Sequence, residues 1–142
     1  MTFENSYSND ERAASYARLE FDGTYYLAYR DLPAIIRKHV KGNRAVDFGC
    51  GAGRSTRFLR ALGFETIGID ISEAMIRKAR SLDSEGDYRL ARDGEYEGVG
   101  VASYDLVLAV FTFDNIPVAQ KRAALLRALK RLLSAQGRII LL

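Results

Sequence analysis

Val46-Asp47-Phe48-Gly49-Cys50-Gly51-Ala52-Gly53 is the stretch that decides the fold of this chain. The apolar residues at its start predict a short buried strand over residues 45–48, and glycines follow at alternate positions. Glycine lets the backbone turn tightly and approach a ligand closely. Residues 54–62 then predict a helix, whose N-terminus points N–H groups at the same turn. The stretch therefore predicts a strand, a ligand-binding turn and a helix in succession.

Beyond this stretch, short apolar strands alternate with amphipathic helices. Further strands are predicted over residues 66–70, 88–91, 106–111 and 139–142. A short helix is predicted over residues 11–20, and a second one follows the cap Asp31 and stops at Gly42. Helices are also predicted over residues 72–82, capped by Ser72, and over residues 119–133, with Gly137 as the stop signal. This alternation predicts an α/β fold: a doubly wound, mostly parallel sheet of about five strands with helices on both faces. Such a sheet binds ligands at the carboxyl ends of its strands where the strand order reverses, and the first strand is expected there.

The composition excludes several classes of function. A single cysteine, Cys50, excludes an intrachain disulfide, and with a single histidine it excludes a Cys/His zinc cluster. The net charge is +3, and the basic residues are interspersed with acids rather than gathered in the block typical of nucleic-acid binding. No apolar run approaches the ~18 residues of a membrane span. We therefore expect a cytoplasmic, single-domain protein without a membrane partner, and nucleic acid is disfavoured.

Three polar features fall at consecutive strand ends. The glycine turn follows the first strand, Asp70 ends the second, and Asp93-Gly94 follows the third. A carboxylate at the second position can accept both hydroxyls of a ribose. Asp93 is placed to accept from an exocyclic amine such as that of adenine. Together the three features predict an adenosine site.

The glycine spacing indicates which adenosine compound binds. A dinucleotide turn has the pattern G-x-G-x-x-G, whereas here the pattern is G-x-G-x-G and Arg54 takes the sixth position. Asp47 also precedes the turn, and a carboxylate there would repel a diphosphate but stabilise a cationic ligand. A positively charged adenosyl compound is therefore favoured over a dinucleotide. Arg54, Arg57 and Arg60 are expected on a solvated helix face.

These segments resemble the class I S-adenosylmethionine-dependent methyltransferases. Five pieces carry the resemblance in order: Val46–Gly53, Gly68–Ser72, Ala91–Gly94, Tyr104–Ala109 and Leu132–Ile139. The resemblance implies a Rossmann-like core over residues 42–142, ending at strand five, and an N-terminal helical lid segment over residues 1–41. It implies S-adenosylmethionine as cofactor and S-adenosylhomocysteine as product.

The resemblance also implies a set of cofactor-binding residues. Asp47 and the loop would face the methionine moiety, Asp70 the ribose, and Ile71 with Asp93 the adenine. Phe111 would lie near the transferring methyl group. The full set is Asp47, Gly49, Cys50, Gly51, Asp70, Ile71, Asp93, Gly94 and Phe111, with Tyr16, Tyr25 and Arg30 from the lid. Cys50 is interpreted as a small residue filling the loop, and no catalytic residue is assigned.

The implied reaction is direct displacement at the sulfonium methyl group, with a small molecule as the expected acceptor. Asp114 and Asn115, after the fourth strand, are candidates for contacts to it. The alternative is a truncated or non-catalytic module that binds S-adenosylmethionine, because the chain stops within strand five, where relatives continue. The strand-five edge would then be exposed, so a homodimer covering it is plausible.

Overall fold

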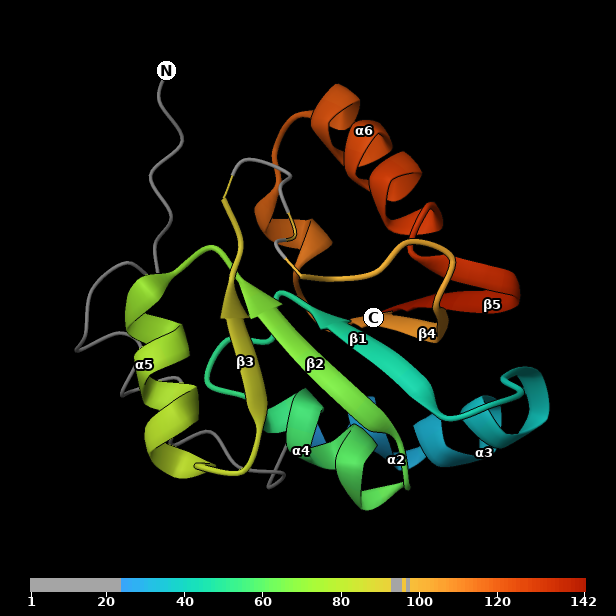
Figure 1. Cartoon of the computed structure of the whole chain (residues 1–142), viewed down its shortest axis with the longest axis horizontal. Helices are drawn as coiled ribbons and strands as arrows, with labels where there is room; N and C mark the ends of the chain where they lie inside the picture. Colours follow the sequence, from blue (N-terminus) through green and yellow to red (C-terminus); the bar gives the residue numbers. More distant parts are fainter. Residues whose placement is uncertain (1–23, 93–95, 97) are drawn as a thin grey trace.

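The computed structural model describes residues 24–92, 96 and 98–142. They form a five-stranded parallel sheet with strand order β3-β2-β1-β4-β5 (Figure 1). The strands are β1 (Arg44–Phe48), β2 (Glu65–Asp70), β3 (Asp87–Leu90), β4 (Tyr104–Ala109) and β5 (Leu133–Leu141). The order reverses between β1 and β4, so the predicted α/β fold and the predicted position of the first strand are confirmed.

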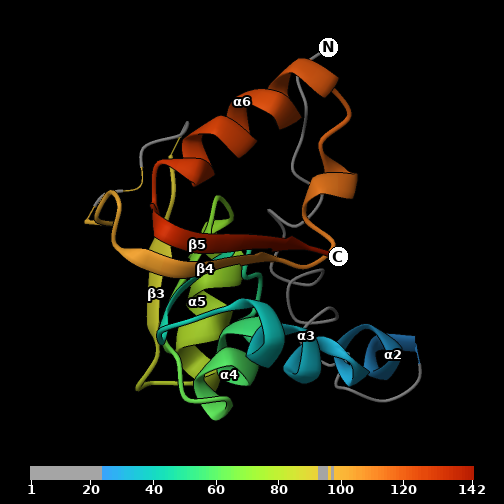
Figure 2. The same cartoon turned by 90° about the vertical axis from the view of Figure 1, so that its right-hand side faces the viewer.

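Helices cover both faces of this sheet. They are α2 (Thr24–Arg30), α3 (Leu32–His39), α4 (Arg54–Ala61), α5 (Glu73–Leu82) and α6 (Ala119–Lys130), with a short 3-10 turn, η1 (Phe113–Asn115). Figure 2 shows α6 on one side of the sheet and α2, α3 and α4 on the other. The crossover helices of a parallel sheet bury both of its faces, which explains why four consecutive residues of β1 are buried.

Each face of the sheet has its own apolar cluster. On the α6 side, Val46 and Val107 pack with Leu129 of the helix. On the other side, Ala45 and Leu106 pack with Leu59 of α4. Two further helix residues, Leu32 and Ile36 of α3, join the second cluster. The helix that precedes β1 is therefore packed on the sheet. The predicted boundary between a lid and a core at residue 42 stays a prediction.

The predicted boundary between the last helix and the last strand is wrong. α6 ends at Lys130 and β5 begins at Leu133, so Gly137 lies inside the strand. Tyr104 pairs with Leu133 and Leu106 with Arg138, which leaves an irregularity between the two pairs. A Cβ on Gly137 would lie 2.8 Å from the carbonyl oxygen of Tyr104. The glycine permits a close backbone approach at this bulge and does not end the helix.

The two predicted helix caps differ in outcome. Ser72 caps α5 as expected, because its side chain accepts a hydrogen bond from the backbone N–H of Met75 at 3.3 Å. Asp31 precedes α3 but makes no side-chain capping bond. Its carboxylate instead accepts from the guanidinium of Arg30, at 2.8 and 3.0 Å. The backbone of Asp31 is already in the helical region, which takes its side chain away from the N-cap geometry.

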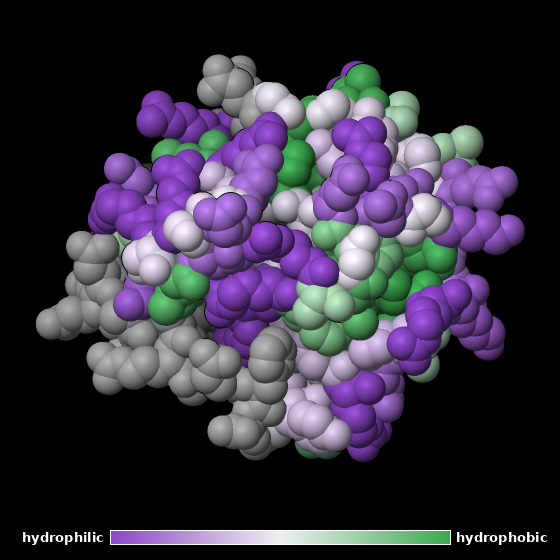
Figure 3. Space-filling view, turned by 60° about the horizontal axis from the view of Figure 1, so that its bottom comes forward, coloured by the Kyte–Doolittle hydropathy of each residue, from purple (hydrophilic) through white to green (hydrophobic). Residues whose placement is uncertain are grey.

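Several surface features bear on partners. β5 is an edge strand, and two residues at its end are exposed: Leu141, which pairs with Ala109 of β4, and Leu142. Tyr26 and Leu27 of α2 are also exposed, and Figure 3 shows a hydrophobic area surrounded by hydrophilic residues on the face that it turns forward. Within the described ranges, no helix is long and apolar enough to span a bilayer. The predicted homodimer stays a prediction.

Candidate functional site

The glycine turn lies at the carboxyl ends of β1 and β2. The N–H groups of Gly49 and Cys50 both donate to the carbonyl oxygen of Ile69, at 2.8 and 3.0 Å. The φ angles of Gly49, Gly51 and Gly53 are 72°, 54° and 87°, in the left-handed region that favours glycine. A Cβ on Gly49 would lie 2.4 Å from side-chain atoms of Thr112. The turn therefore requires glycine both for its conformation and for its contact with the segment after β4.

Asp70 ties this turn to the start of α5. Its Oδ2 accepts from the N–H of Gly51 at 2.9 Å and its Oδ1 from the N–H of Ser72 at 2.8 Å. Burial raises the pKa of the Asp70 carboxyl, and the hydrogen bonds from Ser72 and Gly51 oppose the rise. Each carboxylate oxygen can accept a further hydrogen bond. Asp70 therefore both fixes the turn and keeps acceptor capacity for a ligand.

Asp47 is fully buried beneath the turn. Its Oδ2 accepts from the hydroxyls of Ser55 and Thr56, each at 2.6 Å. Its Oδ1 has no hydrogen-bond partner among the described residues. Burial raises the pKa of the Asp47 carboxyl to about 6, and the nearby Asp70 charge adds to the rise. A cationic ligand at the turn would stabilise both carboxylates in their charged forms.

Ile71 and Cys50 both lie beside the turn, where the sequence predicted them. Ile71, directly after Asp70, exposes 59% of its surface at the end of β2. An exposed apolar side chain there is available to pack on a flat ring. Cys50 is buried, and its thiol points to the carbonyl oxygen of Gly51 at 3.6 Å. Burial raises the pKa of this thiol well above its usual value, so Cys50 is not an activated nucleophile.

Phe111 lies two residues beyond the end of β4, although its segment was predicted to be strand. Its φ angle is 55°, which is uncommon for a bulky aromatic residue. Its N–H donates to the carbonyl oxygen of Leu142 at 2.8 Å, and its carbonyl oxygen accepts from the Asn115 side chain at 2.7 Å. Tyr25 of α2 packs against it, with ring centroids 5.8 Å apart. The predicted residues Tyr25 and Phe111 are thus in contact.

Arg30 lies apart from this group. Its side chain is exposed and forms an ion pair with Asp31 at 2.8 Å. Binding a cofactor carboxylate would require the guanidinium to leave that partner, so its role stays a prediction. Three other predicted residues, Tyr16, Asp93 and Gly94, lie outside the described residues, as does the helix predicted over residues 11–20.

The arginines of α4 are not the solvated face that the sequence predicted. Arg54 is only 7% exposed, and its guanidinium carbon lies 4.3 Å from the centroid of the Tyr25 ring. Arg57 donates to the carbonyl oxygen of Ala52 at 2.9 Å, and Arg60 pairs with Asp83 at 2.6 Å. Helical periodicity places all three on related faces, but it carries no information about which neighbours cover them. Arg54 is therefore among the site residues that sequence reasoning missed, together with Ser55 and Thr56, which bind Asp47.

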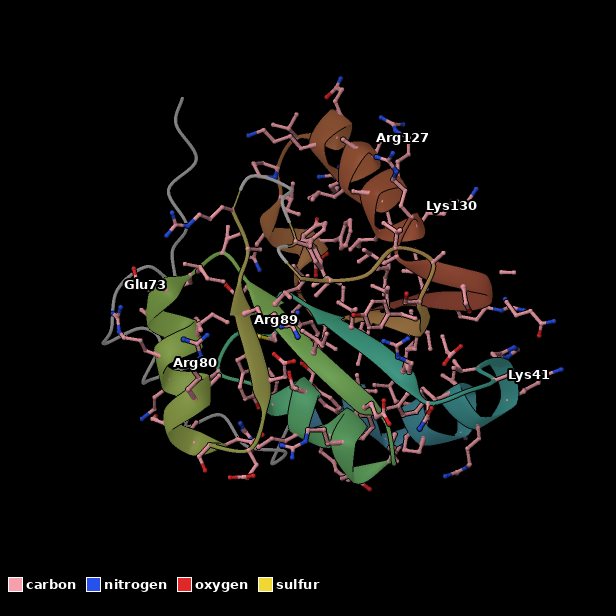
Figure 4. All side chains as sticks on the ribbon, in the orientation of Figure 1. Lys41, Glu73, Arg80, Arg89, Arg127 and Lys130 are labelled. Atoms are coloured by element: carbon pink, nitrogen blue, oxygen red, sulfur yellow. The ribbon has the colours of Figure 1, made fainter. Side chains whose placement is uncertain are left out.

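Exposed charges elsewhere do not gather at the turn. The labelled cations Lys41, Arg80, Arg89, Arg127 and Lys130 are spread over several parts of the fold, and Arg127 and Lys130 of α6 point away from the sheet (Figure 4). Asp114 and Asn115 lie in η1 and are exposed. The site is therefore a turn with two acidic side chains beneath it and an aromatic pair at the end of β4.

A family model described as a methyltransferase domain matches residues 46–139. The chain belongs to this family, and its fold is that of the class I S-adenosylmethionine-dependent methyltransferases. The match begins in β1 and ends in β5, so it includes the turn, both aspartates and the end of β4.

Individual relatives agree with this assignment. The chain is 28% identical over 109 residues to a ubiquinone biosynthesis O-methyltransferase from Xanthomonas oryzae pv. oryzae, covering 74% of this chain and 44% of that protein. It is 32% identical over 78 residues to an 18S rRNA (guanine-N(7))-methyltransferase from Mus musculus, covering 55% and 28%. A solved S-adenosylmethionine-dependent methyltransferase from Mesorhizobium loti is 27% identical with a TM-score of 0.63, covering 80% and 52%. The chain spans less than half the length of these curated relatives.

Proposed function

We propose that this chain binds S-adenosylmethionine at the carboxyl ends of β1, β2 and β4 and methylates an oxygen of a small-molecule acceptor. The observation that carries the proposal is the buried Asp47 carboxylate, whose Oδ1 lacks a hydrogen-bond partner among the described residues. A buried carboxylate with a raised pKa is stabilised by a nearby positive charge. A cationic adenosyl compound supplies that charge, whereas a dinucleotide diphosphate would oppose it.

The residues of the turn support distinct parts of the cofactor. Asp70 would accept the ribose hydroxyls with the acceptor capacity that Gly51 and Ser72 leave. Ile71 would pack on the adenine ring, and the buried Asp47 carboxylate would attract the positive end of the methionine moiety from beneath the turn. When bound, S-adenosylmethionine supplies an electrophilic methyl group on a positively charged sulfur. The chain would accelerate the displacement chiefly by aligning the acceptor with that methyl group.

The acceptor is proposed from the relatives and from the end of β4. The two curated relatives differ in the methylated atom, and the longer match is to the O-methyltransferase. Tyr25 and Phe111 form an aromatic pair where the methyl group is expected, and such a pair suits an aromatic acceptor. A hydroxyl acceptor must lose its proton, and the exposed Asp114 in η1 is our candidate to receive it.

Titration calorimetry with S-adenosylmethionine tests the binding step. We expect micromolar affinity for wild type, and NAD is expected to bind more weakly. Asp70→Ala should weaken the binding of S-adenosylmethionine by about 10- to 150-fold, because hydrogen bonds to a charged group are lost. Asp87→Ala is the matched control, because Asp87 is an exposed aspartate that pairs with Arg89 at the start of β3. Tighter binding of NAD would contradict the proposal.

A turnover assay tests the transfer step. Methyl-labelled S-adenosylmethionine is incubated with the chain and catechol as the probe acceptor, and both S-adenosylhomocysteine and methylated catechol are measured. Labelled methoxyphenol supports O-methylation. Binding without transfer to catechol or to any other hydroxyl compound tried would support the alternative of a non-catalytic cofactor-binding module.

A further inference from the structure

Two aromatic contacts join α2 to α4 in register. Tyr29 of α2 packs against Phe58 of α4, with ring centroids 4.9 Å apart. Tyr25, one helical turn earlier, lies under the guanidinium of Arg54, one turn earlier on α4. Residues four apart share one face of a helix, so the two pairs form successive contacts between the same helix faces. Both helices lie on the same side of the sheet (Figure 2).

The two contacts differ in their surroundings. Tyr29 is buried in the apolar cluster that includes Leu59 and Leu106, and Phe58 packs against that cluster. Arg54 instead directly follows Gly53, the last residue of the turn, and Tyr25 also contacts Phe111 at the end of β4. The Tyr29–Phe58 contact, called the inner contact here, therefore belongs to the core. The Tyr25–Arg54 contact, called the outer contact, lies at the carboxyl ends of the strands.

Packing alone does not account for an arginine at the outer contact. Phenylalanine makes the equivalent contact one turn further along α4, and a guanidinium is more costly to bury than a phenyl ring. Yet Arg54 is 7% exposed. A cation over an aromatic face attracts the ring electrostatically, and an apolar neighbour supplies no such attraction. The arginine thus restricts Tyr25, the residue of α2 whose ring packs against Phe111.

The dependence of α2 on tertiary contacts makes this restriction matter. A helix of ordinary length is only marginally stable by itself in water, so the position of the described part of α2 depends on its contacts with the rest of the fold. Phe111, with its φ of 55°, also needs surroundings that hold it in an unfavourable conformation. Tyr25 contacts both Arg54 and Phe111, so a single side chain joins α2, the turn and the segment after β4.

We propose that Arg54 is a positioning residue that holds Tyr25 against Phe111 and so closes the methionine end of the cofactor site. This inference rests on the proposed function, because it assigns the ends of the site as that function does. The ribose end, at Asp70, lies on a different strand and has no part in the contact. Loss of the cation should therefore weaken the binding of ligands that carry the amino-acid tail and leave the binding of ligands that lack it unchanged.

Calorimetry with two ligands tests the proposal. S-adenosylmethionine carries the tail, and 5′-methylthioadenosine lacks it. We expect Arg54→Gln to raise the Kd of S-adenosylmethionine about 5- to 20-fold, the range that loss of a buried cation–π contact allows. The Kd of 5′-methylthioadenosine should change less than about twofold, which is within ordinary context effects. Tyr25→Leu should reproduce this pattern, and the double variant should be no weaker than the worse single variant.

Conservative variants and matched controls separate positioning from folding. Arg54→Lys keeps a cation and Tyr25→Phe keeps a ring, so both should retain most of the affinity for S-adenosylmethionine. Arg44→Gln removes a second arginine–tyrosine contact of the described residues, in which the Arg44 guanidinium lies 5.2 Å from the Tyr104 ring at the amino ends of the strands. This change should leave the binding of both ligands unaffected. Phe58→Leu breaks the inner contact and should lower thermal stability without changing the ratio of the two affinities.

Each contrary result has a definite meaning. If Arg54→Gln weakens both ligands equally, or neither, the positioning role is overturned while the proposed function stands. If wild type binds neither 5′-methylthioadenosine nor S-adenosylmethionine, the proposed function fails and this inference fails with it. If Arg54→Gln does not fold, as judged by thermal unfolding, the comparison of Tyr25→Leu with Tyr25→Phe decides the outcome.

Discussion

Asp47 and Asp70 lie near the ends of the neighbouring strands β1 and β2, yet their carboxylates differ in burial and in hydrogen-bond partners. Asp47 lies within β1 and points to α4, where two hydroxyls donate to one of its oxygens. Asp70 is the last residue of β2, and two backbone N–H groups donate to its two oxygens. A carboxylate inside a strand is sealed by the covering helix, whereas one at the strand end meets the loops. Position along the strand therefore separates a buried charge from a ligand-accessible one.

The largest expected effect concerns the titration of Asp47. Its folded pKa of about 6 lies above the usual 3.8, so the folded state holds its proton more tightly than the unfolded state. Stability should therefore fall as pH rises from about 4 to about 6, by roughly 3 kcal/mol, and stay low above that range. Asp47→Asn should remove this part of the pH dependence. Urea unfolding of both proteins across that range measures it.

The control for this prediction lies in the difference between the two proteins. Burial also raises the pKa of Asp70, which adds a trend of the same sign in wild type and variant alike. Only the change removed by Asp47→Asn belongs to Asp47. A variant curve parallel to that of wild type would show that Asp47 titrates normally and that the contrast between the two aspartates is wrong.

The second prediction separates the two carboxylates by ligand. Asp70→Asn should weaken S-adenosylmethionine and 5′-methylthioadenosine together, by about 1.5–3 kcal/mol, because both carry the ribose. Asp47→Asn should weaken only S-adenosylmethionine, because only that ligand brings a positive charge. Calorimetry at pH 8, above the pKa of about 6 of Asp47, gives for each variant the ratio of its affinity to that of wild type for each ligand. If both variants weaken the binding of the two ligands to the same extent, the proposed difference in role between Asp47 and Asp70 is wrong.

The third prediction concerns the hydroxyls that hold Asp47. Thr56→Val removes one of two donors at 2.6 Å while keeping the side-chain volume. At pH 8 this should destabilise the fold by about 1–2 kcal/mol, since a hydrogen bond to a charged group is lost. Thr66→Val is the matched control, because Thr66 is also buried but its hydroxyl donates to a carbonyl oxygen at 3.3 Å. A larger loss in the control would argue against a charged Asp47.

The smallest effect is expected beside Asp70. Ser72→Ala removes the side-chain cap of α5, which should lower stability by about 1 kcal/mol. The N–H of residue 72 still donates to Asp70 in this variant, so the affinity for S-adenosylmethionine should be unchanged. Thermal unfolding and calorimetry on the same samples check both statements. A marked loss of affinity would show that the cap, and not the backbone bond, positions Asp70.

Much of the fold was predictable because its signals are local. Apolar runs between polar segments mark the strands, and the alternation with helices dictates parallel pairing. The error in an element boundary comes from the C-terminal region, where Gly137 has the spacing of a helix stop. The structure uses it instead where β5 bulges against Tyr104. A glycine permits both uses, and only the neighbouring strand distinguishes them.

The sequence by itself determined the order of the elements, the glycine turn and the two aspartates near the strand ends, because each depends on residues close together in the chain. Only the tertiary structure decided that Asp47 is sealed by Ser55 and Thr56 while Asp70 receives backbone N–H groups. It also decided that Arg54 is buried against Tyr25, a residue of another helix. Burial and charge environment depend on which segments pack together, and helical or strand periodicity does not specify that.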